Sequence, residues 1–178
     1  MLLGSLQGCF PVVAAGVGTG ALMASDRRTT GTYIEDEGIE DKAGYQVSLK
    51  YQDKAHVNVT SYNRHVLLTG EVPDEQSKTD IAKIVAGVMN VKAVSNELVV
   101  SGKASFTSRS SDTIITGDVK LRFINNKVFE PDHVKVITES GVVYLMGLVY
   151  HKEADAAADI ASTTNGVLRV VKVFEYLD

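Results

Sequence analysis

The stretch Val143-Tyr144-Leu145-Met146-Gly147-Leu148-Val149 repeats a pattern that first occurs at Val66-Leu67-Leu68-Thr69-Gly70-Glu71-Val72. Both stretches read V-x-L-x-G-x-V. Valine, leucine and valine at alternate positions are typical of the buried face of a β-strand, and the glycine indicates a point where a side chain would obstruct close packing. The two glycines lie 77 residues apart (147 − 70 = 77), so the chain is predicted to contain two copies of one unit.

The repeat extends on both sides of this strand. Upstream, His56-Val57-Asn58-Val59 aligns with His133-Val134-Lys135-Val136 at the same spacing. Downstream, Asn90-Val91-Lys92-Ala93-Val94 aligns with Gly166-Val167-Leu168-Arg169-Val170 at a spacing of 76, which requires one deletion. Two modules of roughly 70 residues each are therefore expected, and modules that small are expected to lean on each other for stability.

Composition excludes several classes of protein. The chain has 178 residues and a formal charge of −4, with no tryptophan and no long basic run, which argues against a general nucleic-acid-binding protein. Its single cysteine excludes both an intramolecular disulfide and a zinc site built from cysteines.

That cysteine, Cys9, follows Leu6-Gln7-Gly8, and the stretch resembles a bacterial lipobox, in which a peptidase cleaves before the cysteine and its sulfur carries a diacylglycerol. A lipobox anchors a protein to a membrane by acyl chains rather than by a spanning helix. The five residues at 1–5 supply neither a charged region nor a full apolar core, which a start codon placed too late would explain. The alternative is a buried structural cysteine. Residues 1–32 are thus expected to form a lipobox remnant and a flexible spacer.

Hydrophobic periodicity predicts the order helix, strand, strand, helix, strand in both modules. In the first module, residues 33–101, Asp74 is the expected N-cap of the second helix. After a linker at 102–111, the second module at 112–178 begins with a helix capped by Asp112. Two helices against one face of a three-stranded sheet make an α+β fold. The expected strands are 56–60, 66–72 and 91–100 in the first module and 133–138, 142–149 and 167–177 in the second.

These patterns together resemble the BON domain, and two such modules behind a lipobox resemble the dual BON-domain periplasmic lipoproteins of Gram-negative bacteria. The resemblance covers about residues 33–178 and Cys9, and its main departure is Asn90, which stands where the family usually has glycine. It implies a non-catalytic module associated with phospholipid binding and envelope integrity. Phe10 replaces the aspartate that resembles an inner-membrane retention signal, so anchoring to the outer membrane is expected.

The first helices of the two modules are predicted to differ on their outer faces. At about 100° per residue, Ile115, Val119 and Phe123 share one stripe, which is expected to face the sheet. Three other aliphatic residues lie outside that stripe, where the first module has Gly38, Tyr45 and Ser48. Aliphatic groups rimmed by cations are suited to an anionic bilayer. The predicted phospholipid-binding residues are Ile114, Val119, Lys120, Leu121, Ile124 and Lys127.

Two alternatives remain for this surface: it packs against the first module, or it binds another envelope protein or a second copy of the chain. A different apolar surface is predicted on the sheet of the second module, where Val142, Tyr144, Met146 and Leu148 share one side of a strand. That side is too apolar for contact with water and is expected to receive the first module or its linker.

We expect no catalytic site, no cofactor and no small-molecule substrate. His56 and His133 occupy matching positions, and no clustered carboxylate lies near either of them at ligand spacing in the sequence, so no metal site is predicted. The acids of the first helix are expected to form a solvated face rather than a catalytic pair. They are Glu35, Asp36, Glu37, Glu40 and Asp41.

Overall fold

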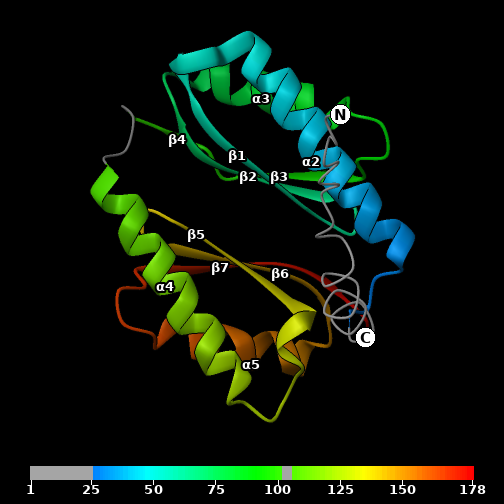
Figure 1. The fold of residues 1–178 in the computed structure, drawn as a ribbon, viewed down its shortest axis with the longest axis vertical. Helices are drawn as coiled ribbons and strands as arrows, with labels where there is room; N and C mark the ends of the chain where they lie inside the picture. Colours follow the sequence, from blue (N-terminus) through cyan, green and yellow to red (C-terminus); the bar gives the residue numbers. More distant parts are fainter. Residues whose placement is uncertain (1–25, 102–105) are drawn as a thin grey trace, which may run out of the picture.

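The computed structural model describes residues 26–101 and 106–178 (Figure 1). Cys9 and the other residues of the predicted lipobox and spacer up to residue 25 lie outside the described residues. In the described ranges, no helix is both long enough and apolar enough to cross a membrane.

The first module contains two helices and a mixed sheet. Strand β2 pairs antiparallel with β1 and parallel with β3 and β4. The third strand expected at 91–100 is divided into β3 and β4, because Leu98 turns into the core and is 1% exposed. The elements are α2 (Thr30–Tyr51), η1 (Gln52–Lys54), β1 (His56–Tyr62), β2 (His65–Val72), α3 (Glu75–Ala86), β3 (Ala93–Asn96) and β4 (Val99–Val100).

The second module repeats this arrangement with an undivided last strand. Strand β6 pairs antiparallel with β5 and parallel with β7. The elements are α4 (Phe106–Ile124), η2 (Pro131–His133), β5 (Val134–Glu139), β6 (Val142–Val149), α5 (His151–Ser162) and β7 (Arg169–Tyr176). The α+β prediction with two tandem modules is therefore confirmed, with a fourth short strand added in the first module.

The two sheets face each other, and each pair of helices covers the outer side of its own sheet (Figure 1). Each module has its own core, in which the first helix contributes one stripe: Ile39, Ala43 and Val47 in α2, and Ile115, Val119 and Phe123 in α4. This is the stripe that helical periodicity predicts. The opposite sides of α2 and α4 are left on the outside of the molecule.

A third apolar cluster joins the two sheets. Tyr62 and Leu67 of the first module pack against Tyr144, Met146 and Leu148 of the second. The predicted docking of the first module on this side of β6 is confirmed. At the edges of the interface the contacts are polar: Lys135 Nζ donates to Glu40 at 2.9 Å, and Asn63 Nδ2 donates to Glu175 at 2.7 Å.

The glycine of the repeated strand is explained by a close backbone approach. A Cβ built on Gly147 would collide with the carbonyl oxygen of His133, and a Cβ on Gly70 would collide with that of His56. The neighbouring strand of the hairpin thus passes too close for any side chain at these positions, as the sequence pattern indicates.

Asp36 and Asp112 have a different role from the ones predicted for them. Asp36, expected on a solvated face, is 2% exposed and accepts from the backbone nitrogens of Asn63 and Arg64 at 2.8 and 2.7 Å. Asp112, expected as an N-cap, lies inside α4 and accepts from the backbone nitrogens of Ser140 and Gly141 at 2.8 Å. Each aspartate therefore secures the tight hairpin turn of its module, where two successive residues have positive φ.

Candidate functional site

The outer face of α4 carries three large aliphatic side chains that the rest of the described chain leaves uncovered. Ile114, Leu121 and Ile124 are 65%, 59% and 65% exposed. They lie on one side of α4 because positions 114, 121 and 124 fall within about 80° of each other around a helix. Neither the core of the second module nor the interface between the modules includes any of the three. We call these three residues the α4 patch.

Val119 does not belong to the α4 patch, and its prediction as a phospholipid-binding residue is wrong. Its side chain is 0% exposed and packs in the core of the second module. The physical reason is helical geometry: Val119 lies one turn from Ile115 and Phe123, so it must face the sheet with them. A bilayer in contact with the outside of α4 cannot reach it.

Two of the three cations near the α4 patch are available to a ligand. Lys120 and Lys127 are exposed, and neither forms an ion pair with another described residue. Arg122 instead binds the end of α5, donating to the carbonyl of Ile160 and to Thr164 Oγ1, both at 2.7 Å. An exposed acid, Asp118, lies in α4 on the flank opposite Lys120. The patch therefore has a basic side and an acidic side.

The structure shows exposed apolar residues that the comparison of the two modules in sequence did not identify. Val128, which follows Lys127 in the loop after α4, is 43% exposed. In the first module, α2 exposes Ile34, Tyr45 and Leu49 by 63%, 64% and 60%. The two modules thus differ less in exposed apolar area than predicted. The difference that remains is charge: α2 has Gly44 where α4 has Lys120 (44 + 76 = 120), and its matching side carries the exposed acids Glu37 and Asp41 beside Lys42.

A pocket of about 640 Å³ opens beside the α4 patch, between the N-terminal half of α2 and the C-terminal half of α4. Lys120 and Ile124 contribute to its wall. Most of its other charged side chains are already paired: Arg28 binds Asp26 and Asp36, and Lys135 binds Glu40. Residues of both modules line the pocket. Ile124 belongs both to its wall and to the α4 patch, and Lys120 lies in the same wall.

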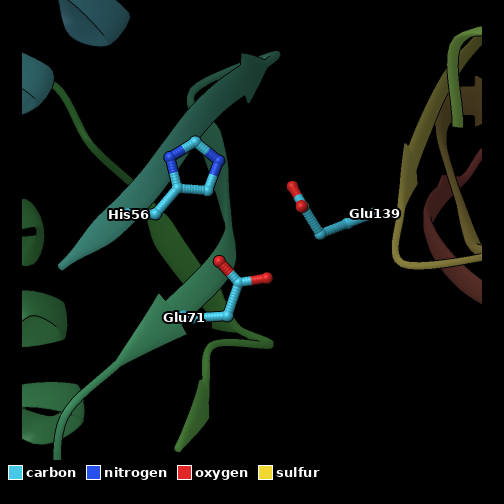
Figure 2. Close-up of side chains that lie close together, drawn as sticks. All are labelled: His56, Glu71 and Glu139. Atoms are coloured by element: carbon cyan, nitrogen blue, oxygen red, sulfur yellow. The ribbon is translucent and has the colours of Figure 1, made fainter. Parts of the chain in front are cut away.

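Two carboxylates lie close to His56 in the fold, although none stands near it at ligand spacing in the sequence. Ligand atoms of His56, Glu71 and Glu139 lie within 4.8 Å of one another (Figure 2). The hairpin register places Glu71 directly opposite His56. Glu139 comes from the other module, so its approach depends on the packing of the two sheets. The register of a two-residue hairpin could have indicated the first pair, but nothing in the sequence indicated the third residue.

Comparison with known proteins identifies the class to which this fold belongs. The family model for the BON domain matches residues 35–102 and again residues 111–178. The chain belongs to the BON domain family and contains two copies of the domain. The resemblance stated from the sequence is therefore confirmed.

Three relatives give the family its context. The chain is 46% identical to the outer membrane lipoprotein DolP of Haemophilus influenzae, over 100% of this chain and 95% of that protein. It is 35% identical to a 21 kDa hemolysin of Actinobacillus pleuropneumoniae, over 85% of this chain and 79% of that protein. It is 28% identical to the osmotically-inducible protein Y of Escherichia coli, over 85% and 77%. None of these names describes an enzyme. The chain is accordingly a lipid-anchored protein of the bacterial envelope.

Proposed function

We propose that the second module binds anionic phospholipid through the α4 patch, while acyl chains on Cys9 hold the protein at the outer membrane. The observation that carries this proposal is the exposure of Ile114, Leu121 and Ile124 together on one side of α4. Three aliphatic side chains in contact with water are unfavourable unless something covers them. The interface between the modules is formed elsewhere, by the sheets, and does not cover them.

Charge favours a lipid surface as the partner. Lys120 and Lys127 have no acidic partner among the described residues, and a lysine near an anionic membrane contributes about 1 kcal/mol. The aliphatic groups enter the boundary between headgroups and acyl chains, where each gains part of the roughly 1.5–3 kcal/mol of full burial. The sum describes a weak contact.

A weak contact is sufficient for a tethered protein. An anchor at Cys9 keeps the second module close to the bilayer, so binding by the α4 patch becomes an intramolecular step with a high effective concentration. The proposed role is therefore to read the lipid composition beside the anchor and to support the integrity of the envelope. No catalytic step is involved.

The test is vesicle flotation with the full chain carrying Cys9→Ala, which removes the acylation site. The chain is expected to float with phosphatidylglycerol vesicles and to bind phosphatidylcholine vesicles more weakly. Leu121→Asp and Lys120→Glu are expected to reduce binding to phosphatidylglycerol at least about tenfold, the equivalent of about 1.4 kcal/mol.

The first module offers a matched control. Tyr45 occupies in α2 the position of Leu121 in α4 (45 + 76 = 121) and is similarly exposed. Tyr45→Asp is expected to leave binding unchanged. If Leu121→Asp binds like the unsubstituted chain, the assigned surface is wrong.

The competing function is protein–protein interaction or self-association through the same patch. Light scattering distinguishes the two. A dimer in detergent-free buffer that is lost on Ile124→Asp, together with unchanged flotation of that variant, assigns the patch to a second copy of the chain instead of to lipid.

A further inference from the structure

We infer that His56, Glu71 and Glu139 form a binding site for a divalent metal ion of the zinc class at the junction of the two modules. This inference is independent of the proposed lipid surface, which lies on the outside of α4. The three ligand atoms lie within 4.8 Å of one another, and the side chains converge from both sheets (Figure 2). A single cation with bonds of about 2.0–2.2 Å can reach all three after small rotations of the two glutamates.

The strongest sign of a missing ligand is Glu71. Its side chain lies on the side of β2 that faces the other sheet and is 5% exposed. Its Oε2 atom has no hydrogen-bond partner among the described residues. A buried carboxylate oxygen without a donor is costly, and such groups are normally paired or bound to a metal. No described residue of the interface beside it donates to this atom.

Neighbouring side chains hold the third ligand in place. Asn58 Nδ2 donates to Glu139 Oε2 at 2.6 Å, and Thr69 Oγ1 lies 3.4 Å from the same oxygen. Metal-binding carboxylates are characteristically oriented by such outer contacts. Asn58 and Thr69 belong to the first module, so they draw Glu139 across the interface toward His56.

The set of donors defines the class of ion. One imidazole and two carboxylates suit Zn²⁺, with a water molecule as the fourth ligand, and the two carboxylates balance its charge. A site with only hard oxygen donors would instead favour Mg²⁺ or Ca²⁺. The imidazole therefore selects against those two ions.

The duplicated module shows that this arrangement is specific to the junction. The second module has His133 at the position of His56, but Leu148 at the position of Glu71 (71 + 77 = 148). Leu148 is buried in the apolar cluster between the sheets. Only the first module carries the acid, and the second supplies Glu139 instead. A bound ion would thus connect β1 and β2 of one module to β5 of the other.

The test uses the full chain with Cys9→Ala, which also removes the only thiol, titrated with ZnCl₂ by calorimetry. One equivalent of Zn²⁺ is expected to bind, with Mg²⁺ binding much more weakly. At a hundredfold excess of free Zn²⁺ over the dissociation constant, the melting temperature is expected to rise by about 5–10 °C. Glu71→Gln and Glu139→Gln each keep the side-chain shape and are expected to weaken Zn²⁺ binding at least about tenfold.

Two control variants separate this site from binding elsewhere. Glu130→Gln changes an exposed glutamate of the second module, and His151→Gln removes an exposed imidazole. Both are expected to retain full Zn²⁺ affinity. The inference is overturned if Zn²⁺ produces neither heat nor a shift in melting temperature. It is equally overturned if Glu71→Gln and Glu139→Gln, both shown to be folded by circular dichroism, bind Zn²⁺ as tightly as the parent chain.

Discussion

Arg27 binds Glu153 through two guanidinium nitrogens, at 2.6 and 2.8 Å, although the two residues lie 126 positions apart in the sequence. The same guanidinium donates to the carbonyl oxygen of Leu148 at 2.8 Å. Arg27 precedes the first helix of the first module, whereas Glu153 lies in the first turn of α5 in the second. The segment that enters the first module is therefore fastened to the second.

Removing this pair is expected to destabilise the whole protein. Bidentate, charge-assisted hydrogen bonds are worth about 1.5–3 kcal/mol when they are shielded from water, so Arg27→Ala should lower the melting temperature by several degrees. Scanning calorimetry checks this. Arg169→Ala is the control, because Arg169 is exposed and approaches Glu97 only to 3.9 Å. Equal effects of the two substitutions would show that the pair of Arg27 and Glu153 stabilises the protein no more than an exposed ion pair does.

The same pair is expected to respond to acid. Hydrogen bonds from Arg27 hold the pKa of Glu153 below its usual value of 4.5. A carboxylate whose pKa is lowered on folding stabilises the protein above its unfolded pKa and loses that contribution as the pH falls through the folded value. The penalty of Arg27→Ala should therefore be largest at pH 7 and shrink below about pH 4. Urea midpoints at pH 7 and pH 3 measure it; a penalty that does not change contradicts the assignment.

The aspartates that bind the hairpin turns are expected to be among the most sensitive polar residues. Asp112→Ala leaves the backbone N–H groups of Ser140 and Gly141 without their acceptor, at a cost of about 2–4 kcal/mol. Asp36→Ala should cost a similar amount for the same reason. Urea unfolding measures both, with the exposed Asp41→Ala as the control. A loss below about 0.5 kcal/mol for Asp112→Ala would contradict the role given to this residue.

Charge beside the α4 patch provides a gain-of-function prediction. Asp118 is exposed on the acidic flank, where its negative charge would oppose the proposed contact with an anionic bilayer. Asp118→Asn is expected to strengthen binding to phosphatidylglycerol vesicles by about fivefold, the equivalent of about 1 kcal/mol per charge. Flotation at low and high salt measures this, because the gain should shrink as salt screens the surface. Asp41→Asn in α2 serves as the control, and an equal gain for that variant would exclude a specific role for α4.

The fold was predictable because the repeated strand pattern indicates, within a few residues, which side of each strand is buried. Alternation in β2 and β6 and the stripe of Ile115 and Phe123 in α4 repeat at the period of their own element, so a short window reveals which side is buried. The division of the last strand of the first module was not predictable. It depends on Leu98, whose burial is decided by the shape of the core and not by its neighbours in sequence.

The site was predictable only in part, for a related reason. The outward direction of Ile114, Leu121 and Ile124 follows from helical geometry alone. The role of Asp112 does not follow from helical geometry. Its carboxylate oxygens accept hydrogen bonds from the backbone of a turn that lies 28 residues or more away in the sequence. Glu139 approaches His56 only through the packing of two modules, and no periodicity encodes that contact.

The bond between Arg27 and Glu153 would also decide how a pull on the N-terminal side of the fold is distributed. Under the proposed acylation of Cys9, which lies 17 positions before Asp26 (26 − 9 = 17), such a pull would come from the membrane. It would meet Arg27 before it meets α2. The pull would thereby be shared between both halves of the molecule, instead of separating one helix from its sheet.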